Sequence, residues 1–251
     1  MDARALNALL KGVKSGKVQI ADAHKALTDL PFADLGFANV DTHRALRTGY
    51  PEVVMAQWKT TEHVVGIVEA LSKRGHSALV TRAQPDKGEA LLQHFPKGEW
   101  FEHAGIFRLE GKHAPRSGKV TVVCAGTSDL RVAEEAALTA EAFGATVHRI
   151  RDVGVAGIHR LLKRRREFDG SHAVVAVAGM EGALASAVGG LVGVPVVAVP
   201  TSVGYGTSFE GITALLSMLN SCASNVAVMN IDNGFGGGFY AAMISRTKGR
   251  R

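Results

Sequence analysis

The two cysteines of the chain stand in surroundings that predict different chemistry. Cys222 lies among small residues at the end of a segment with helical spacing, in the string MLNSCA that starts at Met218. A helix C-terminus disfavours a thiolate, so a reactive Cys222 needs a compensating cation, either a basic side chain or a positively charged substrate. Cys124 lies inside an apolar, strand-like run and is expected to be an inert part of the core. Cys222 is therefore the candidate nucleophile, with a structural role as the alternative.

Three titratable side chains follow strand-like runs in the C-terminal half. Asp152 and His159 come just past the run that ends at Ile150, and His159 could titrate near neutral pH as an acid, a base or an orienting group. Glu181 stands at the expected first turn of a helix, among Gly, Met and Ala. There its carboxylate would be poorly solvated and could serve as a general base, although partnership with the helix dipole is the simpler interpretation.

Loops of glycine and small polar residues follow the apolar runs of the same half, and their backbone amides could line an anion site. Residues 201–211 make a loop longer than the usual connection from a strand to a helix, which is typical of a binding loop. The glycines from Gly234 to Gly238 are expected to form a phosphate-wrapping loop before a helix at Phe239, although they lack the Walker lysine and the G-x-G-x-x-G spacing. For the loop that contains Ser128 and Asp129, the alternative role is to cap the helix that follows it. The candidate substrate-binding residues in these loops are Thr127, Ser128, Asp129, Ser202, Gly204, Tyr205, Gly206, Asn233, Gly234 and Gly236.

A second set of charged residues lies in the N-terminal half. Asp41, Arg44 and Arg47 are spaced by threes, which places a carboxylate and two guanidiniums on one face of a helical turn. Such a face could bind phosphate or carboxylate, and a surface ion-pair ladder is the alternative. Lys59 follows shortly after and is a further candidate for binding an anion.

The pattern of elements changes at a linker, HAPRSG, from His113 to Gly118, which predicts a first domain of residues 1–117 and a second of residues 118–251. For the first domain we expect a smaller α+β fold that begins with a helical hairpin. Its expected helices are 2–14, 17–30, a turn around 41–47, 61–74 and 85–95, and its expected strands are 35–40, 53–57, 77–83 and one or two within 100–109.

The second domain alternates strand and helix in five units. Its strands are almost uniformly apolar, so both faces of the sheet must be covered, which predicts a parallel five-stranded sheet in a flavodoxin-like three-layer α/β sandwich. The expected strands are 120–124, 146–150, 173–178, 195–199 and 226–231, and the expected helices are 130–143, 155–166, 182–191, 209–220 and 239–245.

Composition limits the partners that we expect. The net charge is +6, but much of it lies in Arg160–Arg166 and Arg246–Arg251, where no aromatic residues interleave, so we expect no nucleic-acid partner. No apolar run could cross a bilayer and the N-terminus lacks a signal peptide's apolar core, which predicts a cytoplasmic protein without a membrane partner. Two cysteines offer no disulfide framework, and no His, Cys and carboxylate cluster has the spacing of metal ligands.

The loops named above carry a resemblance to a known family. The C-terminal half closely resembles the aminoimidazole ribonucleotide (AIR) carboxylase-like domain, and the whole chain resembles the LarB family, synthases that begin the assembly of the nickel-pincer cofactor. The strings that carry it are TSD at Thr127, DVGVAGIHRLL at Asp152, AGMEGALAS at Ala178, VPTSVGYGTSFEG at Val199, MLNSCA at Met218, NIDNGFGGGF at Asn230, LGFANVDTHRALRTGYPEVV at Leu35, and Lys59-Thr60.

The resemblance implies an enzyme that adds a carboxyl group from CO2 or bicarbonate to C5 of the pyridinium ring of nicotinic acid adenine dinucleotide and cleaves the phosphoanhydride. It matches Cys222 to the nucleophile. We hypothesise that Glu181 removes the C5 proton with Asp152 or His159 assisting, and that Ser128 and Asp129 hold CO2 or the ring carboxylate. The dinucleotide phosphates would bind the residues 202–207 and 234–238, with Arg44, Arg47 and Lys59 completing the anion site.

The same resemblance implies a symmetric homo-oligomer, such as an octamer, and no tightly bound cofactor. It leaves open whether Mg2+ takes part, and nickel would enter the pathway later. One departure from the family pattern is visible: Gln57-Trp58 precedes Lys59 where a smaller pair containing glycine is expected. Two alternative functions remain, a purine-pathway carboxyaminoimidazole ribonucleotide mutase or carboxylase, which the His159-Arg160 pair favours, and a non-catalytic nucleotide-binding module.

Overall fold

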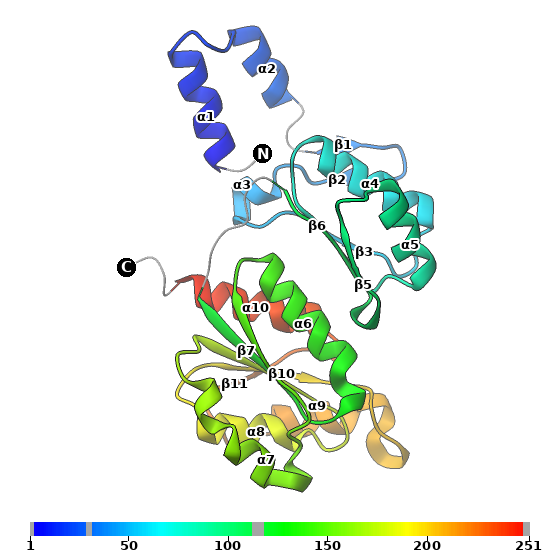
Figure 1. The fold of residues 1–251 in the computed structure, drawn as a ribbon, viewed down its shortest axis with the longest axis vertical. Coiled ribbons are helices and arrows are strands. Elements are labelled where there is room, and N and C mark those ends of the chain that lie inside the picture. The colour runs from blue at the N-terminus through cyan, green and yellow to red at the C-terminus, as the bar shows by residue number, and fades with distance from the viewer. Residues whose placement is uncertain (1–2, 29–31, 112–117, 248–251) are drawn as a thin grey trace. The chain divides into compact units, whose positions relative to one another are not determined.

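The computed structural model describes residues 3–28, 32–111 and 118–247. The chain divides into two compact units, Met1–Ala114 and Pro115–Arg251, and each is described by itself (Figure 1). Most of the predicted linker, residues 113–117, lies outside the described residues. No described helix is long and apolar enough to cross a membrane.

The first unit begins with the expected helical hairpin, α1 (Ala3–Lys14) and α2 (Ile20–Thr28), and continues as a small mixed α/β fold. Its four-stranded sheet has the order β3-β4-β6-β5, in which only β3 and β4 are parallel. The strands are β3 (Val53–Met55), β4 (Ala78–Thr81), β5 (Glu99–Phe101) and β6 (Ile106–Leu109), and the helices are α3 (Arg44–Thr48), α4 (Thr61–Lys73), α5 (Pro85–His94) and the 3-10 turn η1 (Glu102–Ala104).

The core of this unit forms where α4 and α5 cover the sheet. Val64, Val68 and Leu71 of α4 are completely or almost completely buried and pack in one cluster with Val80 and Phe107 of the sheet. Thr60 begins α4 by accepting a hydrogen bond from the backbone N–H of His63, which satisfies a donor that the first helical turn leaves open.

The prediction of one strand over residues 35–40 is wrong. The segment is a tight hairpin of two short strands, β1 (Ala33–Asp34) and β2 (Asn39–Val40). Gly36 adopts φ 79°, and its N–H donates to Oδ1 of Asp34 at 2.7 Å. A left-handed glycine and an aspartate that bonds two residues ahead are the chemistry of a turn, so the chain reverses where we expected it to run straight.

The second unit is the predicted parallel sheet, with the order β11-β10-β9-β7-β8. All six residues of the central strand β9 are buried, as a strand covered on both faces requires. The strands are β7 (Lys119–Cys124), β8 (Thr146–Ile150), β9 (Ala173–Ala178), β10 (Val196–Pro200) and β11 (Val226–Val228).

Helices cover both faces of this sheet, which gives the three layers of a flavodoxin-like fold (Figure 1). On one face α6 (Leu130–Ala142) packs on α10 (Gly234–Thr247), and on the other α8 (Ala183–Leu191) packs on α9 (Ile212–Leu219). The remaining helical pieces are the turns η2 (Thr127–Asp129), η3 (Val155–Gly157), η4 (Arg165–Phe168) and η5 (Gly206–Gly211), and the short helix α7 (Ile158–Lys163).

Three expected boundaries in this unit are wrong. The helix expected over residues 155–166 is broken into η3, α7 and η4, and β11 ends at Val228. The helix expected to begin at Phe209 begins at Ile212, because Phe209 and Glu210 both adopt left-handed conformations, with φ of 44° and 53°. Side chains rarely take that conformation inside a helix, so the chain turns there instead.

The glycine run from Gly234 to Gly238 is also not the loop that we expected, because it forms the first turns of α10. A Cβ on Gly234 would overlap the carbonyl oxygen of Val132, and a Cβ on Gly238 would overlap that of Ala136. Val132 and Ala136 are four residues apart on α6, as the two glycines are on α10. The glycines therefore let two helix backbones approach closely.

This close packing predicts different effects for two Gly→Ala substitutions in helices. Gly238→Ala should lower the free energy of unfolding by about 1–3 kcal/mol or more, because the new methyl group would meet backbone that cannot move aside. Gly190→Ala in α8 is the matched control. Nothing lies within 4 Å of its added Cβ, so it should stabilise the protein by about 0.5–1 kcal/mol. Urea unfolding of both variants measures the difference, and equal effects would contradict the packing role.

Candidate functional site

The order of the parallel strands places a topological switch point between β7 and β9. From β7 the chain moves outward to β8, and it then returns to the other side of β7 to build β9, β10 and β11. Ligands of open α/β sheets bind at the carboxyl ends of the strands beside such a point. The loops that leave those ends carry most of the residues that we expected to bind substrate.

A buried carboxylate joins three of these loops. Asp129 is 3% exposed, and its Oδ2 accepts the N–H of Gly126 at 2.9 Å. Its Oδ1 accepts the N–H of Gly179 at 3.1 Å and the hydroxyl of Thr201 at 2.7 Å. The first two residues of η2, Thr127 and Ser128, are exposed. Asp129 therefore holds the ends of β7, β9 and β10 together, while the two hydroxyls before it face solvent.

Glu181 lies in the turn between β9 and α8. It precedes the first residue of α8 by two positions and stands between two left-handed residues, Met180 with φ 54° and Gly182 with φ 69°. The expectation that it lies in the first helical turn in a poorly solvated position is wrong, because its side chain is exposed. An exposed carboxylate at this edge is open to a ligand.

Asp152 and His159 follow β8. Asp152 is left-handed, with φ 57°, and its Oδ2 accepts a hydrogen bond from Nη1 of Arg160 at 2.6 Å. His159 is exposed on α7. Gly154 donates its N–H to the carbonyl of Ala125 at 2.8 Å, which ties this loop to the loop after β7. The structure thus brings the β8 loop to the same edge.

The loop after β10 presents exposed residues on a fixed base. Ser202 donates its N–H to Oδ1 of Asp232 at 2.9 Å, which connects it to the loop after β11. Tyr205 is 81% exposed, and Gly204 and Gly206 on either side of it are also exposed. This arrangement agrees with a binding loop and gives its aromatic ring no packing partner in the core.

Asn233 and the glycines after it belong to the start of α10. The Oδ1 of Asn233 accepts the N–H of Gly236 at 2.8 Å, which is the bond that an N-cap residue makes to a first-turn amide. Gly234 is buried against α6, and Gly236 is partly buried. The amide of Gly236 therefore already has an acceptor within the protein.

Cys124 occupies the buried environment that its sequence context predicts, whereas Cys222 does not lie in the helix that it was expected to end. Cys124 is 1% exposed, and burial raises the pKa of its thiol. Cys222 is exposed and lies three residues beyond the end of α9. We expected Cys222 to be the last residue of this helix, and it instead follows the helix. Its neighbour Ser221 shares a hydrogen bond with Ser186 of α8, with 2.7 Å between the two hydroxyl oxygens. The structure therefore attaches the Cys222 segment to α8.

Asn225 fixes the other side of the Cys222 segment. Its Nδ2 lies within 3.2 Å of three carbonyl oxygens around the end of α8, those of Gly189, Val192 and Val194. The peptide that carries the thiol is thus held at both ends while the thiol itself is open to solvent. Among the described residues no hydrogen bond joins Cys222 to Glu181 or to the loop after β7.

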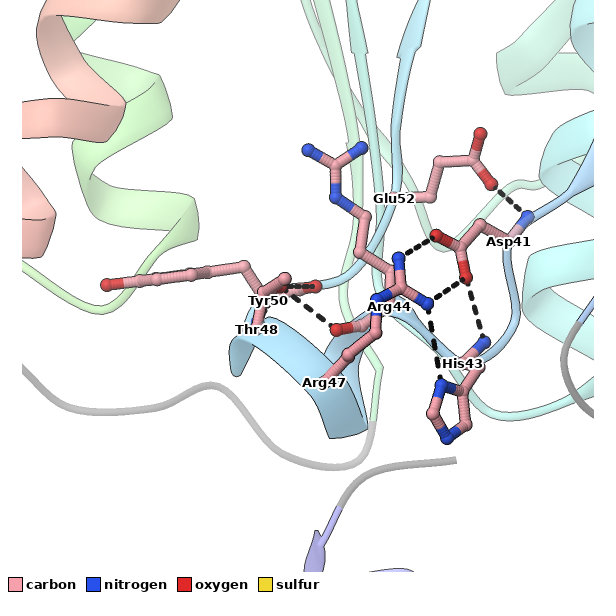
Figure 2. A network of polar contacts seen from close by, with 7 residues as sticks. All are labelled: Asp41, His43, Arg44, Arg47, Thr48, Tyr50 and Glu52. Atoms are coloured by element: carbon pink, nitrogen blue, oxygen red, sulfur yellow. Dashed lines mark hydrogen bonds and ion pairs between the residues drawn. The ribbon is translucent and has the colours of Figure 1, made fainter.

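Figure 2 shows the charged cluster of the first unit, around α3. Oδ2 of Asp41 accepts a hydrogen bond from Nη2 of Arg47 at 2.8 Å, and the N–H of Asp41 donates to Oε2 of Glu52 at 2.6 Å. Burial alone would raise the pKa of Asp41, but the hydrogen bond and charge of Arg47 outweigh it and lower that pKa. The expected set of Asp41, Arg44 and Arg47 is therefore adjacent, and Arg47 is engaged in an ion pair.

Arg44 differs from Arg47 in its contacts. No hydrogen bond or ion pair of its guanidinium is found among the described residues, although its charge acts on both Asp41 and Glu52 (Figure 2). Burial raises the pKa of Glu52, against the opposing charges of Arg44 and Lys59. Lys59 donates from Nζ to the carbonyl of Met55 at 3.0 Å. Arg44 is accordingly the guanidinium of this cluster that can still receive an anion.

Sequence reasoning missed several residues of these networks. Thr201 and Gly179 hold Asp129, and Asp232 holds Ser202, yet we singled out none of them. Their signal is positional, because each comes directly after a parallel strand or in the Asp-Asn-Gly turn before α10. No group of three or more His, Cys, Asp and Glu suited to a metal ion occurs in the described parts of the chain.

Comparison with known proteins identifies both units. Residues 32–112 match the model of the LarB/PurE-like N-terminal domain, and residues 119–251 match that of AIR carboxylase. The chain belongs to the AIR carboxylase family, with a LarB-like architecture. A relative in Methanocaldococcus jannaschii, the uncharacterized protein MJ0165, is 36% identical over 254 residues, which cover 96% of this chain and 97% of that protein.

Family membership confirms the resemblance and the fold that we predicted, and it supports a carboxylase-type enzyme. Asp129 holds three loops of the sheet edge together. The exposed side chains beside it, Ser128 and Glu181, are free to face a ligand.

The Asp129 network predicts that Asp129→Asn destabilises the protein. The amide can keep one oxygen for Gly179 and Thr201, but its NH2 group would then face the N–H of Gly126, leaving two donors opposed. We expect a loss of about 1–3 kcal/mol in the free energy of unfolding. Ser128→Ala, at the exposed neighbour, should change it by less than about 0.5 kcal/mol. A denaturation midpoint for Asp129→Asn equal to that of Ser128→Ala would refute this account.

Proposed function

We propose that this protein carboxylates nicotinic acid adenine dinucleotide at C5 of its pyridinium ring and hydrolyses the phosphoanhydride, giving pyridinium-3,5-biscarboxylic acid mononucleotide and AMP. This would be the first step of nickel-pincer cofactor synthesis. The observation that carries the proposal is a thiol, Cys222, exposed on an AIR carboxylase fold whose other cysteine is buried. The LarB/PurE-like N-terminal domain supports the same substrate.

The proposed reaction needs a nucleophile because a pyridinium ring cannot attack CO2. The Cys222 thiolate adds to the ring, forms a C–S bond and moves the electron pair of a ring double bond onto the nitrogen, which gives a neutral enamine. C5 of the enamine attacks CO2 and forms the new C–C bond. Loss of the C5 proton and expulsion of the thiolate then restore the aromatic cation, so no oxidant or reductant is required.

The other roles are proposed for residues of the loops that follow the parallel strands. Glu181, exposed at the end of β9, is proposed to take the C5 proton, with Asp152 or His159 assisting. Thr127, Ser128 and Asp129 are proposed to form the pocket for CO2 or the ring carboxylate, and since both oxygens of Asp129 already accept hydrogen bonds, its part is to position the loop.

The phosphates of the dinucleotide are assigned to residues that offer amides or cations. In the second unit these are Ser202, Gly204, Tyr205, Gly206, Asn233, Gly234 and Gly236. The first unit offers Arg44, Arg47 and Lys59 as a separate candidate site for an anion. Among the three cations, Arg44 has the guanidinium without a described partner, while Arg47 is paired with Asp41. The proposal includes no tightly bound cofactor, and Mg2+ would act as a counter-ion of the phosphates.

The test of the nucleophile uses the two cysteines as a matched pair. Intact protein exposed to the dinucleotide without bicarbonate should gain the mass of one dinucleotide, and Cys222→Ala should not. Cys222→Ala should also lower the rate of carboxylation by about 1,000-fold or more. Cys124→Ala should keep the adduct and the activity, because Cys124 is buried in β7.

Two outcomes would count against the proposal. If Cys222→Ala carboxylated the dinucleotide as fast as the parent protein, the thiol would have no part in the reaction. If the parent protein released no AMP and formed no carboxylated product, the purine-pathway carboxylase reaction of the same family would be favoured, and an aminoimidazole ribonucleotide would be the next substrate to supply.

We further propose that the protein is a homo-oligomer in which a second copy covers α9. One face of this helix carries three exposed apolar side chains: Ile212, with Leu216 four and Leu219 seven positions after Ile212. They are 43%, 59% and 62% exposed. A second copy of the chain is the occupant that offers the same apolar face in equal amount, as a two-fold interface requires.

The oligomer proposal predicts that Leu216→Glu lowers the mass of the particle in solution. A buried carboxylate without a partner would disfavour association, whereas Ser217→Glu adds the same charge to another face of α9 and should leave the mass unchanged. Light scattering after size exclusion measures both variants. A monomeric parent protein, or a Leu216→Glu variant of unchanged mass, would exclude this interface.

A further inference from the structure

Left-handed residues mark the carboxyl ends of the parallel strands in both units. Seven described residues other than glycine have positive φ, and each follows a parallel strand. Five of them lie in the second unit, at the edge that holds the candidate site, and two lie in the first unit, after β3 and β4. They are Asp152, Met180, Phe209, Glu210 and Asp232 in the second unit, and Trp58 and Arg82 in the first.

Trp58 is the unusual member of this set. It adopts φ 64°, a conformation that costs a residue with a side chain about 1 kcal/mol or more, and its indole is 84% exposed. Its ring therefore buries little surface in the unit, and its backbone conformation is strained. Strain of this kind, together with an exposed aromatic ring, is typical of residues that contact a ligand.

Two positively charged residues lie near Trp58: one is its neighbour in the chain, and the other contacts the preceding residue, Gln57. Lys59 follows Trp58 in the chain. Its ammonium group donates one hydrogen bond to the carbonyl of Met55 and has three N–H donors in all. In space, Arg82 at the end of β4 donates from Nη1 to Oε1 of Gln57 at 3.3 Å, which holds the ends of the two parallel strands together. The edge thus combines one flat aromatic surface with two cations.

We propose that the carboxyl edge of β3 and β4 is a nucleotide-binding site, in which Trp58 stacks on the base and Lys59 and Arg82 hold the phosphate. A cationic ligand would be repelled by the two charges, and an anion without a ring would leave the indole uncovered. A nucleotide satisfies both features, since every base has an aromatic face and its phosphate is an anion. The inference rests on the proposed function only for the choice of AMP as the probe.

The test uses Trp58 as its own reporter in the full chain. The chain has two tryptophans, and replacing the other one by Trp100→Phe leaves Trp58 as the only source of indole fluorescence. AMP should quench that fluorescence in a saturable way and should protect it from acrylamide. Adenosine should quench more weakly because it lacks the phosphate, and inorganic phosphate alone should not quench.

Two variants separate the roles of ring and charge. Trp58→Gly suits the left-handed backbone, so the protein should remain folded with an equal or higher melting temperature, yet bind AMP about tenfold or more weakly by calorimetry. Lys59→Gln should weaken binding of AMP and leave binding of adenosine unchanged. Phe209→Gly removes another exposed ring at a left-handed position, in the second unit, and should not change quenching of Trp58 by AMP.

Other results would overturn the inference. Unchanged binding of AMP by Trp58→Gly, or an absence of quenching at millimolar AMP, would show that this edge binds no nucleotide. Shielding of Trp58 that grows with protein concentration and without AMP would show that a second copy covers the ring. These readouts need no turnover, so they would fail independently of the carboxylation assay.

Discussion

The second unit depends on one buried carboxylate that serves three strands. Asp129 accepts hydrogen bonds from Gly126, Gly179 and Thr201, which follow β7, β9 and β10. A buried charge is tolerated only when donors surround it, so the carboxylate and the three loops stabilise one another. Three candidate residues of the edge are close to this centre in sequence: Ser128 precedes Asp129, Glu181 follows Gly179 by two positions, and Ser202 follows Thr201. The exposed candidate side chains are therefore attached to backbone that the buried Asp129 network holds in place.

On the face of the sheet that α6 and α10 cover, glycines allow close packing of the backbone. The glycines of α10 remove side chains where the helix would meet α6, and Gly237 does so where it meets Val199 of β10. The first turns of α10 can therefore pack closely against the sheet. Asn233 caps the start of this helix by accepting the N–H of Gly236. A run of glycines that resembles a phosphate loop in the sequence is in this fold a packing surface.

Much of the fold could be predicted from the sequence because its strands are buried on both faces. Ala173–Ala178 has the predicted bounds, since a continuous apolar run leaves few alternatives. Thr146–Ile150 also has its predicted bounds, although His148 and Arg149 interrupt its apolar residues. The errors occur where tertiary contacts decide the backbone. Nothing local indicates that Phe209 and Glu210 turn left-handed, and nothing local shows that Asp129 bonds Thr201, which is 72 positions away.

The place of the candidate residues in the fold could be predicted more readily than their contacts. Asp129 follows β7 as expected, but its capping and binding roles were inferred from neighbours in sequence, whereas two of its three described partners follow other strands. Glu181 was expected to be desolvated because Gly, Met and Ala surround it in sequence, but it is exposed, in a turn between two left-handed residues. Family resemblance assigned the fold without fixing either geometry.

The exposure of Cys222 bears on which form of the substrate would react. Among the described residues no basic side chain bonds to this thiol, and the helix before it favours cations over anions at that end. In the proposed reaction a bound pyridinium ring would supply the missing positive charge, and a cation beside a thiolate stabilises it. Because linkage is reciprocal, the thiolate strengthens binding of the cation by the same amount. A neutral dihydropyridine provides neither effect, so the chemistry would select the oxidised, cationic ring without any side chain devoted to the discrimination.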